Sequence, residues 1–221
     1  EQVASGSGLR VSSSEDISPS LTAERFKSRA LDSSFAAAYF PDVSMMYTQP
    51  TPTGTIEKEV FAPPSVHVAK TIAEIDKEGT VFGPSGITRG ILTDAVQTKV
   101  KFEATQRSTL KKLYDAAINP IVESTGGPYI YSQRTLENRD SLFQSIAIRR
   151  MVIEIRRTVK ELAQRMLFEQ NDDQVLKKFE ILVKPVLAKM LTAGGITRYK
   201  VKIDATTTTK DDIERNLVKG Q

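Results

Sequence analysis

The chain lacks cysteine and tryptophan, and it contains a single histidine among its 221 residues. Without cysteine it has neither a disulfide framework nor a thiolate nucleophile. The one histidine, His67, would have to serve any histidine-based triad or metal site, and it lies between two valines, where a structural histidine is the commoner outcome. We therefore expect no catalytic residues, no metal site and no bound cofactor.

Long apolar runs are absent as well. No stretch approaches the roughly 20 apolar residues that a membrane-spanning helix needs, so we expect no membrane insertion. No basic start followed by an apolar stretch marks a signal peptide. The first residue is Glu1 rather than methionine, and we interpret the chain as a fragment of a longer protein. With 39% hydrophobic residues it can still bury a core of its own.

The glycine motifs differ from the phosphate-binding fingerprints. Residues 83–86 read Gly-Pro-Ser-Gly and residues 126–128 read Gly-Gly-Pro, and neither has the Gly-x-Gly-x-x-Gly order or the Gly-Lys-Ser/Thr ending of a P-loop. Both patterns predict turns. Acidic pairs at residues 172–173 and 211–212 come where helices are expected to begin, and there capping is commoner than acid–base catalysis.

The formal net charge of +4 is concentrated in one segment. Residues 145–167 hold six basic and two acidic residues, a difference of four that equals the whole excess of the chain. The basic residues are Arg149, Arg150, Arg156, Arg157, Lys160 and Arg165. Such a face indicates an acidic partner. Three interpretations stay open: a solvated, salt-bridged helix, an ionic contact with a neighbouring subunit, and binding to a nucleic-acid backbone.

The C-terminal half gives the clearest elements. Apolar residues recur at steps of four and three over residues 145–168, which predicts a long amphipathic helix with a continuous stripe. The stripe consists of Ile148, Val152, Ile155, Val159, Leu162 and Met166. A second long helix over residues 171–193 contains Pro185, which predicts a kink or a break near Ile181. The pair at residues 194–195, Gly-Gly, is expected to end it.

The middle of the chain predicts a helix followed by a hairpin. Residues 105–118 have a helical apolar pattern that Asn119-Pro120 is expected to stop. Residues 121–122 and 129–131 then flank a glycine turn, which predicts two antiparallel strands. Near the C-terminus, residues 199–204 alternate like a half-buried strand.

The N-terminal half gives weaker patterns. They predict, in order, a mobile arm over residues 1–20, a helix over 22–40 closed by Pro41, a short strand over 45–47, a loop over 49–54, a helix capped by Ser65 and ended by Gly79, and a loop over 81–90.

Together these elements predict an α/β (α+β) fold in which a small mixed β-sheet packs against the two long helices in a two-layer core. We expect residues 1–33 to form a flexible arm or linker that can contain a short helix. Residues 34–221 are expected to form the core domain, with a sub-boundary near residue 103.

Several segments, in order along the chain, resemble motifs of the contractile tail sheath family. They span about 170 residues, from Phe35 to Asp204. They read Phe-Ala-Ala-Ala-Tyr-Phe-Pro at 35–41, Ala-Pro-Pro-Ser at 62–65, Ile-Asn-Pro-Ile at 118–121, Gly-Gly-Pro-Tyr-Ile-Tyr-Ser-Gln-Arg-Thr-Leu at 126–136, Ile-Ala-Ile-Arg-Arg at 146–150, Phe-Glu-Gln-Asn-Asp at 168–172 and Val-Lys-Ile-Asp at 201–204. The chain departs from the family pattern at Phe82 and Tyr131, which stand at tryptophan positions, and at Gln170, which replaces a proline.

The resemblance implies a structural virion protein and not an enzyme. Subunits of this family form stacked hexameric rings around a tail tube, exchange strands with neighbours, and contract to drive the tube through a cell envelope. The implied partners are other copies of the chain, the tail tube protein and baseplate proteins, with no small-molecule substrate. The implied location is the virion tail, assembled in the host cytoplasm. Phage tails, bacteriocins and injection devices are all compatible with these motifs.

The resemblance also gives the charged and turn residues expected roles. We expect subunit contacts at Arg149, Arg150, Arg156, Arg157 and Lys160. We expect the core and its turn to be held by Asn119, Gly126, Gly127, Pro128 and Arg134. The alternative function is a basic, nucleic-acid-associated virion or cellular protein, whose binding to DNA would weaken steeply with salt.

Overall fold

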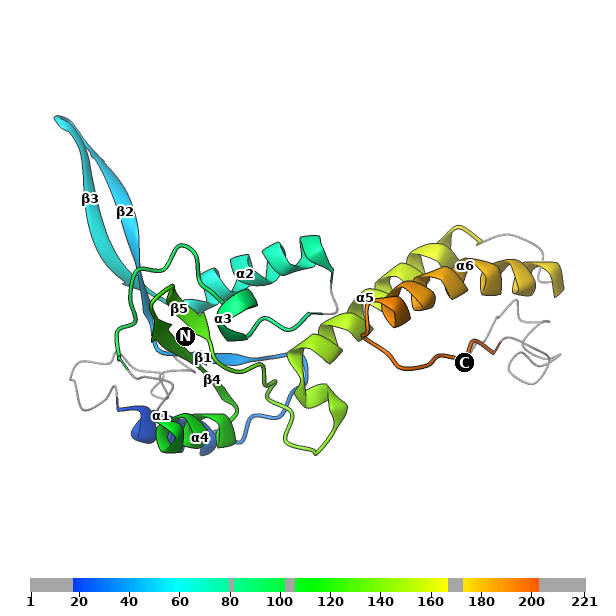
Figure 1. The fold of residues 1–221 in the computed structure, drawn as a ribbon, viewed down its shortest axis with the longest axis horizontal. Coiled ribbons are helices and arrows are strands. Elements are labelled where there is room, and N and C mark those ends of the chain that lie inside the picture. Colours follow the sequence, from blue (N-terminus) through cyan, green and yellow to red (C-terminus); the bar gives the residue numbers. More distant parts are fainter. Residues whose placement is uncertain (1–17, 80–81, 102–105, 167–172, 203–221) are drawn as a thin grey trace. The chain divides into compact units, whose positions relative to one another are not determined.

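The computed structural model describes all of the chain except residues 1–17, 80–81, 102–105, 167–172 and 203–221 (Figure 1). The chain divides into two compact units, Glu1–Arg149 and Arg150–Gln221, which are treated separately below. Several expected features lie outside the described residues: most of the N-terminal arm, the first residue of the acidic pair at 172–173, and the acidic pair at 211–212.

A three-stranded mixed sheet organises the first unit. It consists of β1 (Ala38–Phe40), β4 (Ile118–Ser124) and β5 (Gly127–Ile130), with β4 in the centre. Strand β1 runs parallel to β4, and β5 runs antiparallel to it. The apolar run of β4 explains its central place, since Ile118, Ile121 and Val122 are fully buried. The hairpin predicted around the glycine turn is confirmed.

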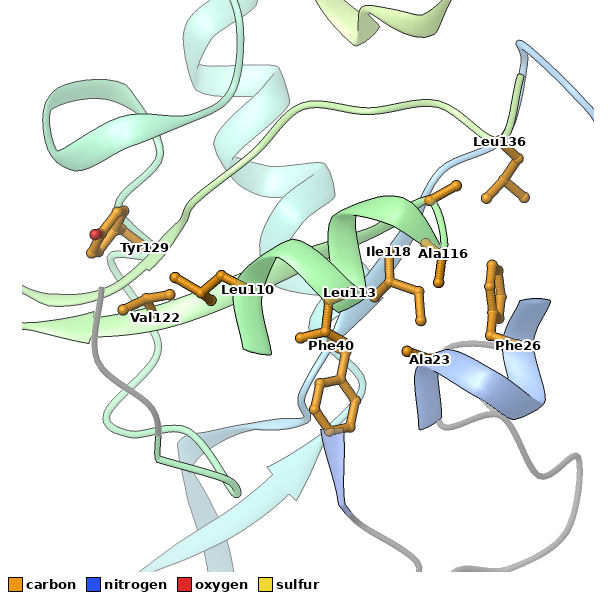
Figure 2. Packing of buried hydrophobic residues seen from close by; sticks show 12 residues of the cluster. Ala23, Phe26, Phe40, Leu110, Leu113, Ala116, Ile118, Val122, Tyr129 and Leu136 are labelled. Carbon is orange, nitrogen blue, oxygen red and sulfur yellow. The ribbon is translucent and has the colours of Figure 1, made fainter. Parts of the chain in front are cut away.

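Helices cover both faces of this sheet. On one face, α4 (Arg107–Asp115) and α1 (Pro19–Lys27) pack through Leu110, Leu113, Ala23 and Phe26, as Figure 2 shows. On the other face, a second cluster joins Val68 of α2 (Pro64–Glu78) to alternate strand residues. Because side chains alternate along a strand, neighbouring residues of β1, β4 and β5 enter opposite clusters.

The α/β fold class is therefore confirmed, but the covering helices differ from those expected. Short helices α1, α4 and α2 cover the sheet, whereas the long helix α5 (Ile146–Gln164) contributes Ile146 to the described core. The apolar clusters also lie on both faces of the sheet, so the core has three layers and not two. The reason is that all three strands carry buried side chains on both faces.

A second sheet, the hairpin of β2 (Val43–Thr51) and β3 (Gly54–Ala62), follows β1 directly. Its strands pair in register from Val43↔Ala62 to Thr51↔Gly54. The strand expected over 45–47 is confirmed, although β2 is longer than predicted. The expected loop over 49–54 is wrong, because only residues 52–53 form a turn. The prolines that suggested a loop lie at the distal end of the hairpin, where Pro52 falls in the turn and no ladder donor is needed.

The segment from Gly90 to Lys99 joins the two sheets. At one end, the N–H of Ile130 donates to the Gly90 carbonyl at 2.8 Å, next to the edge of β5. At the other end, the Ser44 N–H donates to the Gln97 carbonyl at 2.8 Å on the edge of β2. At the same end, a carboxylate oxygen of Glu123 in β4 accepts from the Thr98 backbone N–H at 2.8 Å. The base of the hairpin is thereby held to the three-stranded sheet.

Three local predictions in the first unit are wrong. Residues 38–40 form β1 instead of continuing a helix, because their side chains fill both faces of the sheet. Asn119-Pro120 lies inside β4, and α4 ends earlier, with Ala117 at a φ of +60°. The N-cap of α2 is Pro63 and not Ser65, which already lies within the helix. Gly79 does end α2, as predicted.

The remaining described elements of the first unit are short. Helix α3 (Gly86–Arg89) is a single turn within the expected loop, and a 3₁₀ turn (Leu142–Gln144) precedes α5. Helix α5 begins in the first unit and continues into the second, which confirms the strongest helix prediction.

The second unit contains most of α5 and also α6 (Asp173–Thr192). Helix α6 runs through Pro185 without interruption, so the predicted break is wrong, and the kink stays a prediction. The helix ends at the expected glycines: Gly194 has a φ of +77°, and the Gly195 N–H donates to the Met190 carbonyl at 2.9 Å. Residues 199–202 form no strand, in contrast to the alternation-based prediction.

The fully buried side chain of Asn119 is the main polar link in the first unit. Its amide nitrogen donates to the carbonyls of Ala38 at 3.0 Å and Arg134 at 2.7 Å. Its carbonyl oxygen accepts from the Arg134 N–H at 2.6 Å and the Ser132 hydroxyl at 2.9 Å. All four bonding positions of the amide are therefore used. Among the side chains of this length, only that of asparagine combines an NH2 donor with a carbonyl acceptor.

Replacing Asn119 by leucine should destabilise the first unit strongly. The change keeps the side-chain size but leaves buried backbone groups of Ala38 and Arg134 without partners, at about 1–3 kcal/mol for each lost group. Urea unfolding followed by circular dichroism measures the loss. Asn138→Leu is the matched control, since its hydrogen bonds are exposed and its effect should be about 1 kcal/mol or less. Equal effects of the two variants would contradict the assignment.

Candidate subunit interface

The turn residues singled out from the sequence lie between β4 and β5. The Ser124 hydroxyl donates to the Gly127 carbonyl at 3.0 Å, and the Gly126 N–H donates to that hydroxyl at 3.3 Å. Gly127 has a φ of +106°, which favours glycine. The Pro128 carbonyl accepts from the Leu92 N–H at 2.9 Å. The motif therefore builds a tight turn and receives the joining segment.

Arg134 braces the end of α4. Its guanidinium lies over the Tyr114 ring, 5.0 Å from the centroid, and donates to the Tyr114 carbonyl at 2.9 Å. The last carbonyls of a helix lack partners within the helix, and a cation there is favoured by the helix dipole. This geometry supports the expected core role of Arg134. Together with Asn119, it links residues 132–134 to β4 and α4.

Arg149 is held within the first unit. Its guanidinium lies between two aromatic rings, 4.3 Å from the centroid of Phe35 and 3.8 Å from that of Phe143. It also donates a hydrogen bond to the Ser34 hydroxyl. These contacts fix the first turn of α5 to the segment before β1. The subunit contact predicted for Arg149 stays a prediction, and its observed contacts are those of an anchor.

The other candidate cations lie on α5 in the second unit. Arg157 donates to Glu154 at 3.1 Å, and its Nε lies 3.8 Å from a carboxylate oxygen of Glu161. These are exposed pairs between neighbouring turns, and such pairs are worth roughly 1 kcal/mol or less. Arg156 and Lys160 are exposed, and Arg150 is half-buried. The structure thus gives the five candidates different surroundings.

His67 is buried in α2, with 4% of its surface exposed, and its Nε2 has no hydrogen-bond partner within the described residues. Desolvation lowers the pKa of His67; Lys70 adds to this effect and Asp94 opposes it. Among the described residues, no group of three or more histidine or acidic side chains could hold a metal ion. In the same part of the chain, no helix has the length and apolarity that crossing a membrane requires.

Two features were missed by sequence reasoning. The first is the aromatic pair around Arg149, because Phe35 and Phe143 are more than 100 positions apart in the sequence. The second is the hairpin of β2 and β3, in which both faces mix charged and apolar residues, so that no clear alternation marks β3 as a strand. The flanking prolines also obscured the hairpin.

The buried neutral state of His67 should make stability depend on pH. The folded state binds the proton less readily than the unfolded chain, whose histidine titrates near about pH 6.5. Stability should therefore be highest above that pH and fall as the pH drops below it, until the lowered folded pKa is reached. Urea midpoints measured between about pH 7.5 and about pH 5.5 should fall less steeply in His67→Asn than in the parent chain. Identical slopes would contradict this assignment.

No protein-family model matches the chain. Two curated relatives do. The chain is 27% identical over 158 residues to the tail sheath protein of Enterobacteria phage T4, an alignment that covers 71% of this chain and 24% of the phage protein. It is 28% identical over 136 residues to the tail sheath protein of Vibrio phage KVP40, covering 61% and 20% respectively. The chain thus matches less than a quarter of the length of either relative.

Solved structures with the same fold come from the anti-feeding prophage. A chain of its six-fold symmetrised baseplate matches with a TM-score of 0.71 and 22% identity, covering 86% of this chain and 50% of that chain. A chain of its contracted helical sheath matches with a TM-score of 0.66 and 24% identity, covering 86% and 51%. At these identities the structural likeness establishes a shared fold. Together with the two phage relatives, it confirms the resemblance predicted from the motifs: over the matched part, this chain is similar to tail sheath proteins.

Proposed function

We propose that this polypeptide is a structural subunit of a contractile tail sheath. In this proposal, copies assemble as stacked hexameric rings around a tail tube and contract to drive the tube through a cell envelope. The observation that carries it is the agreement of two independent likenesses in one chain: sequence similarity to two tail sheath proteins, and the fold of a contracted helical sheath component.

The chemistry of the motif residues supports a structural role. The side-chain amide of Asn119 makes all of its hydrogen bonds to backbone groups and to one hydroxyl. Arg134 donates to a carbonyl at the end of α4. Both side chains therefore stabilise the framework and face no site where a substrate could react. We propose no enzymatic activity. The proposed partners are other copies of the chain, the tail tube protein and baseplate proteins, in a virion tail that assembles in the host cytoplasm.

The proposed motion requires rigid subunits with exchangeable contacts. Hydrogen bonds of the Asn119 type, buried in a packed core, resist deformation of the first unit during movement. Exposed ion pairs are individually weak, so one set can be replaced by another at little cost. Sheath contraction is then a rigid-body rearrangement toward a state of lower free energy, driven by many small differences summed over many copies.

The nucleic-acid alternative is not favoured by the surroundings of two of the candidate cations. Arg157 has two carboxylates of its own helix as neighbours, and Arg149 is held between two aromatic rings. Neither guanidinium is displayed as an open phosphate-binding group. Steep, salt-dependent binding of the chain to DNA would reverse this judgement.

Immunogold electron microscopy tests the function directly. Antibodies against the first unit should label particles from the source along the whole tail, between head and baseplate, in both extended and contracted tails. Label restricted to the head or to the baseplate, or absent from tails altogether, would contradict the sheath proposal.

Reversing two α5 charges should prevent assembly without unfolding the subunit. In Arg156→Glu/Arg157→Glu, two exposed cations become anions on a surface proposed to meet an acidic neighbour, so attraction becomes repulsion. The matched control, Arg29→Glu/Lys111→Glu, makes the same charge change at exposed positions of the first unit. Sheath formation by the native-length protein is scored by electron microscopy, and folding by circular dichroism. Normal sheaths from the α5 variant would reject these residues as contacts.

A further inference from the structure

The β2–β3 hairpin exposes large apolar side chains along its length that a monomer would normally bury. Each is between 40% and 59% exposed, and they are Met46, Tyr47, Ile56, Val60 and Phe61. In Figure 1 the two strands extend away from the other elements of the first unit. A lone two-stranded hairpin is only marginally stable in water, and a cluster of exposed apolar groups marks an interaction surface.

The register assigns these residues to two faces. Ser44↔Phe61, Met46↔Glu59 and Thr48↔Glu57 are directly opposite each other and alternate with the pairs of the other face. We call Met46, Thr48, Glu57, Glu59 and Phe61 the acidic face. The other face consists of the pairs Met45↔Val60, Tyr47↔Lys58, Gln49↔Ile56 and Thr51↔Gly54. None of these residues carries a carboxylate, and Lys58 carries a positive charge. The two faces therefore differ in charge.

The carboxylate of Glu59 is held ionised on the acidic face. Hydrogen bonds from Ser44 and from Gln97 lower the pKa of Glu59, and the Gln97 amide donates to it at 2.6 Å. Gln97 belongs to the segment that joins the hairpin to the main sheet, and its backbone bonds to Ser44. The carboxylate is thus positioned by the fold and stays negatively charged at neutral pH.

A surface of matching character lies on α5. Ile153, Arg156 and Lys160 follow each other at steps of three and four, so they share one side of the helix. All three are exposed, and Ile153 is 45% exposed despite its size. We call these three residues the basic face of α5. It lies away from the apolar stripe that begins at Ile148.

The order of the residues on the two faces corresponds, and the spacing of the charged residues is similar. Along β3 the acidic face reads Phe61, Glu59, Glu57 toward the tip, and along α5 the basic face reads Ile153, Arg156, Lys160. Two residues along a strand separate the carboxylates by about 6.7 Å. Four residues along a helix separate the cations by about 6 Å. An apolar contact can therefore form beside two ion pairs at the same time.

We propose that the acidic face of the hairpin docks on the basic face of α5 in a second copy of the chain. Glu59 then faces Arg156, Glu57 faces Lys160, and Phe61 covers Ile153. This inference rests on the proposed sheath function, because it names which surfaces of neighbouring subunits meet. The two faces are different surfaces, so the contact passes from copy to copy and generates a ring or a helix instead of a closed two-fold dimer.

Charge-reversal variants of the full chain test the contact. Sedimentation velocity should show that Glu57→Lys/Glu59→Lys and Arg156→Glu/Lys160→Glu each lose association by about tenfold or more, because two attractive pairs become repulsive. An equimolar mixture of the two variants should regain association, since each hairpin then meets a complementary helix. Lys58→Glu, on the other face of the same hairpin, should associate like the parent chain.

Several outcomes would overturn the proposal. A monomeric parent chain, or variants that associate as the parent does, would show that these faces are not the contact. A further variant combines all four charge reversals in one chain. If this variant regains association while the mixture of the two double variants does not, the contact lies within one copy. If tails carry the immunogold label but the association results contradict the docking, the sheath function is supported and only the docking is rejected.

The absence of cysteine from the chain provides a direct second measurement. Copies carrying Glu59→Cys, mixed with copies carrying Arg156→Cys, should form a disulfide-linked dimer under mild oxidation, visible on a non-reducing gel. Lys58→Cys mixed with Arg156→Cys is the matched control and should give at least about tenfold less dimer, because its side chain points to the other face. Equal yields from the two mixtures would contradict the docking even if a charge variant misfolded.

Discussion

The arrangement of the first unit depends on the buried amide of Asn119. Three segments distant in sequence, β1, β4 and residues 132–134, meet around one side chain that satisfies two donors and two acceptors. A buried polar group without partners costs more than its bonds contribute on balance, so such a residue strongly favours the one arrangement that satisfies it. The apolar clusters on both faces then have a fixed sheet to pack against.

Polar contacts also connect the core of the first unit to the elements at its surface. Arg134 completes the end of α4, and Arg149 fixes the start of α5 between two aromatic rings. The joining segment holds the base of the hairpin through backbone bonds and Glu123. The base of the hairpin and the first turn of α5 are therefore both held by polar contacts within the first unit.

Sequence reasoning succeeded where a signal was local. The amphipathic stripe gave α5, the glycine turn gave the β4–β5 hairpin, and Gly79 and Gly194 gave helix ends. It failed where a pattern depended on distant partners. Residues 38–40 and Asn119-Pro120 had helical or helix-ending patterns, but pairing of β1 with β4 placed them in strands. Pro50 and Pro52 suggested a loop, whereas the ladder continues to the tip of the hairpin.

The sequence by itself determined the local elements and the segment that carries the charge, and its motifs resembled those of tail sheath proteins. Only the tertiary structure decided what each polar residue does. It separated Arg149, an anchor, from exposed Arg156 and Lys160, and it gave the hairpin two unlike faces. The physical reason is that burial and pairing depend on which distant segments meet, and neither spacing nor composition encodes that meeting.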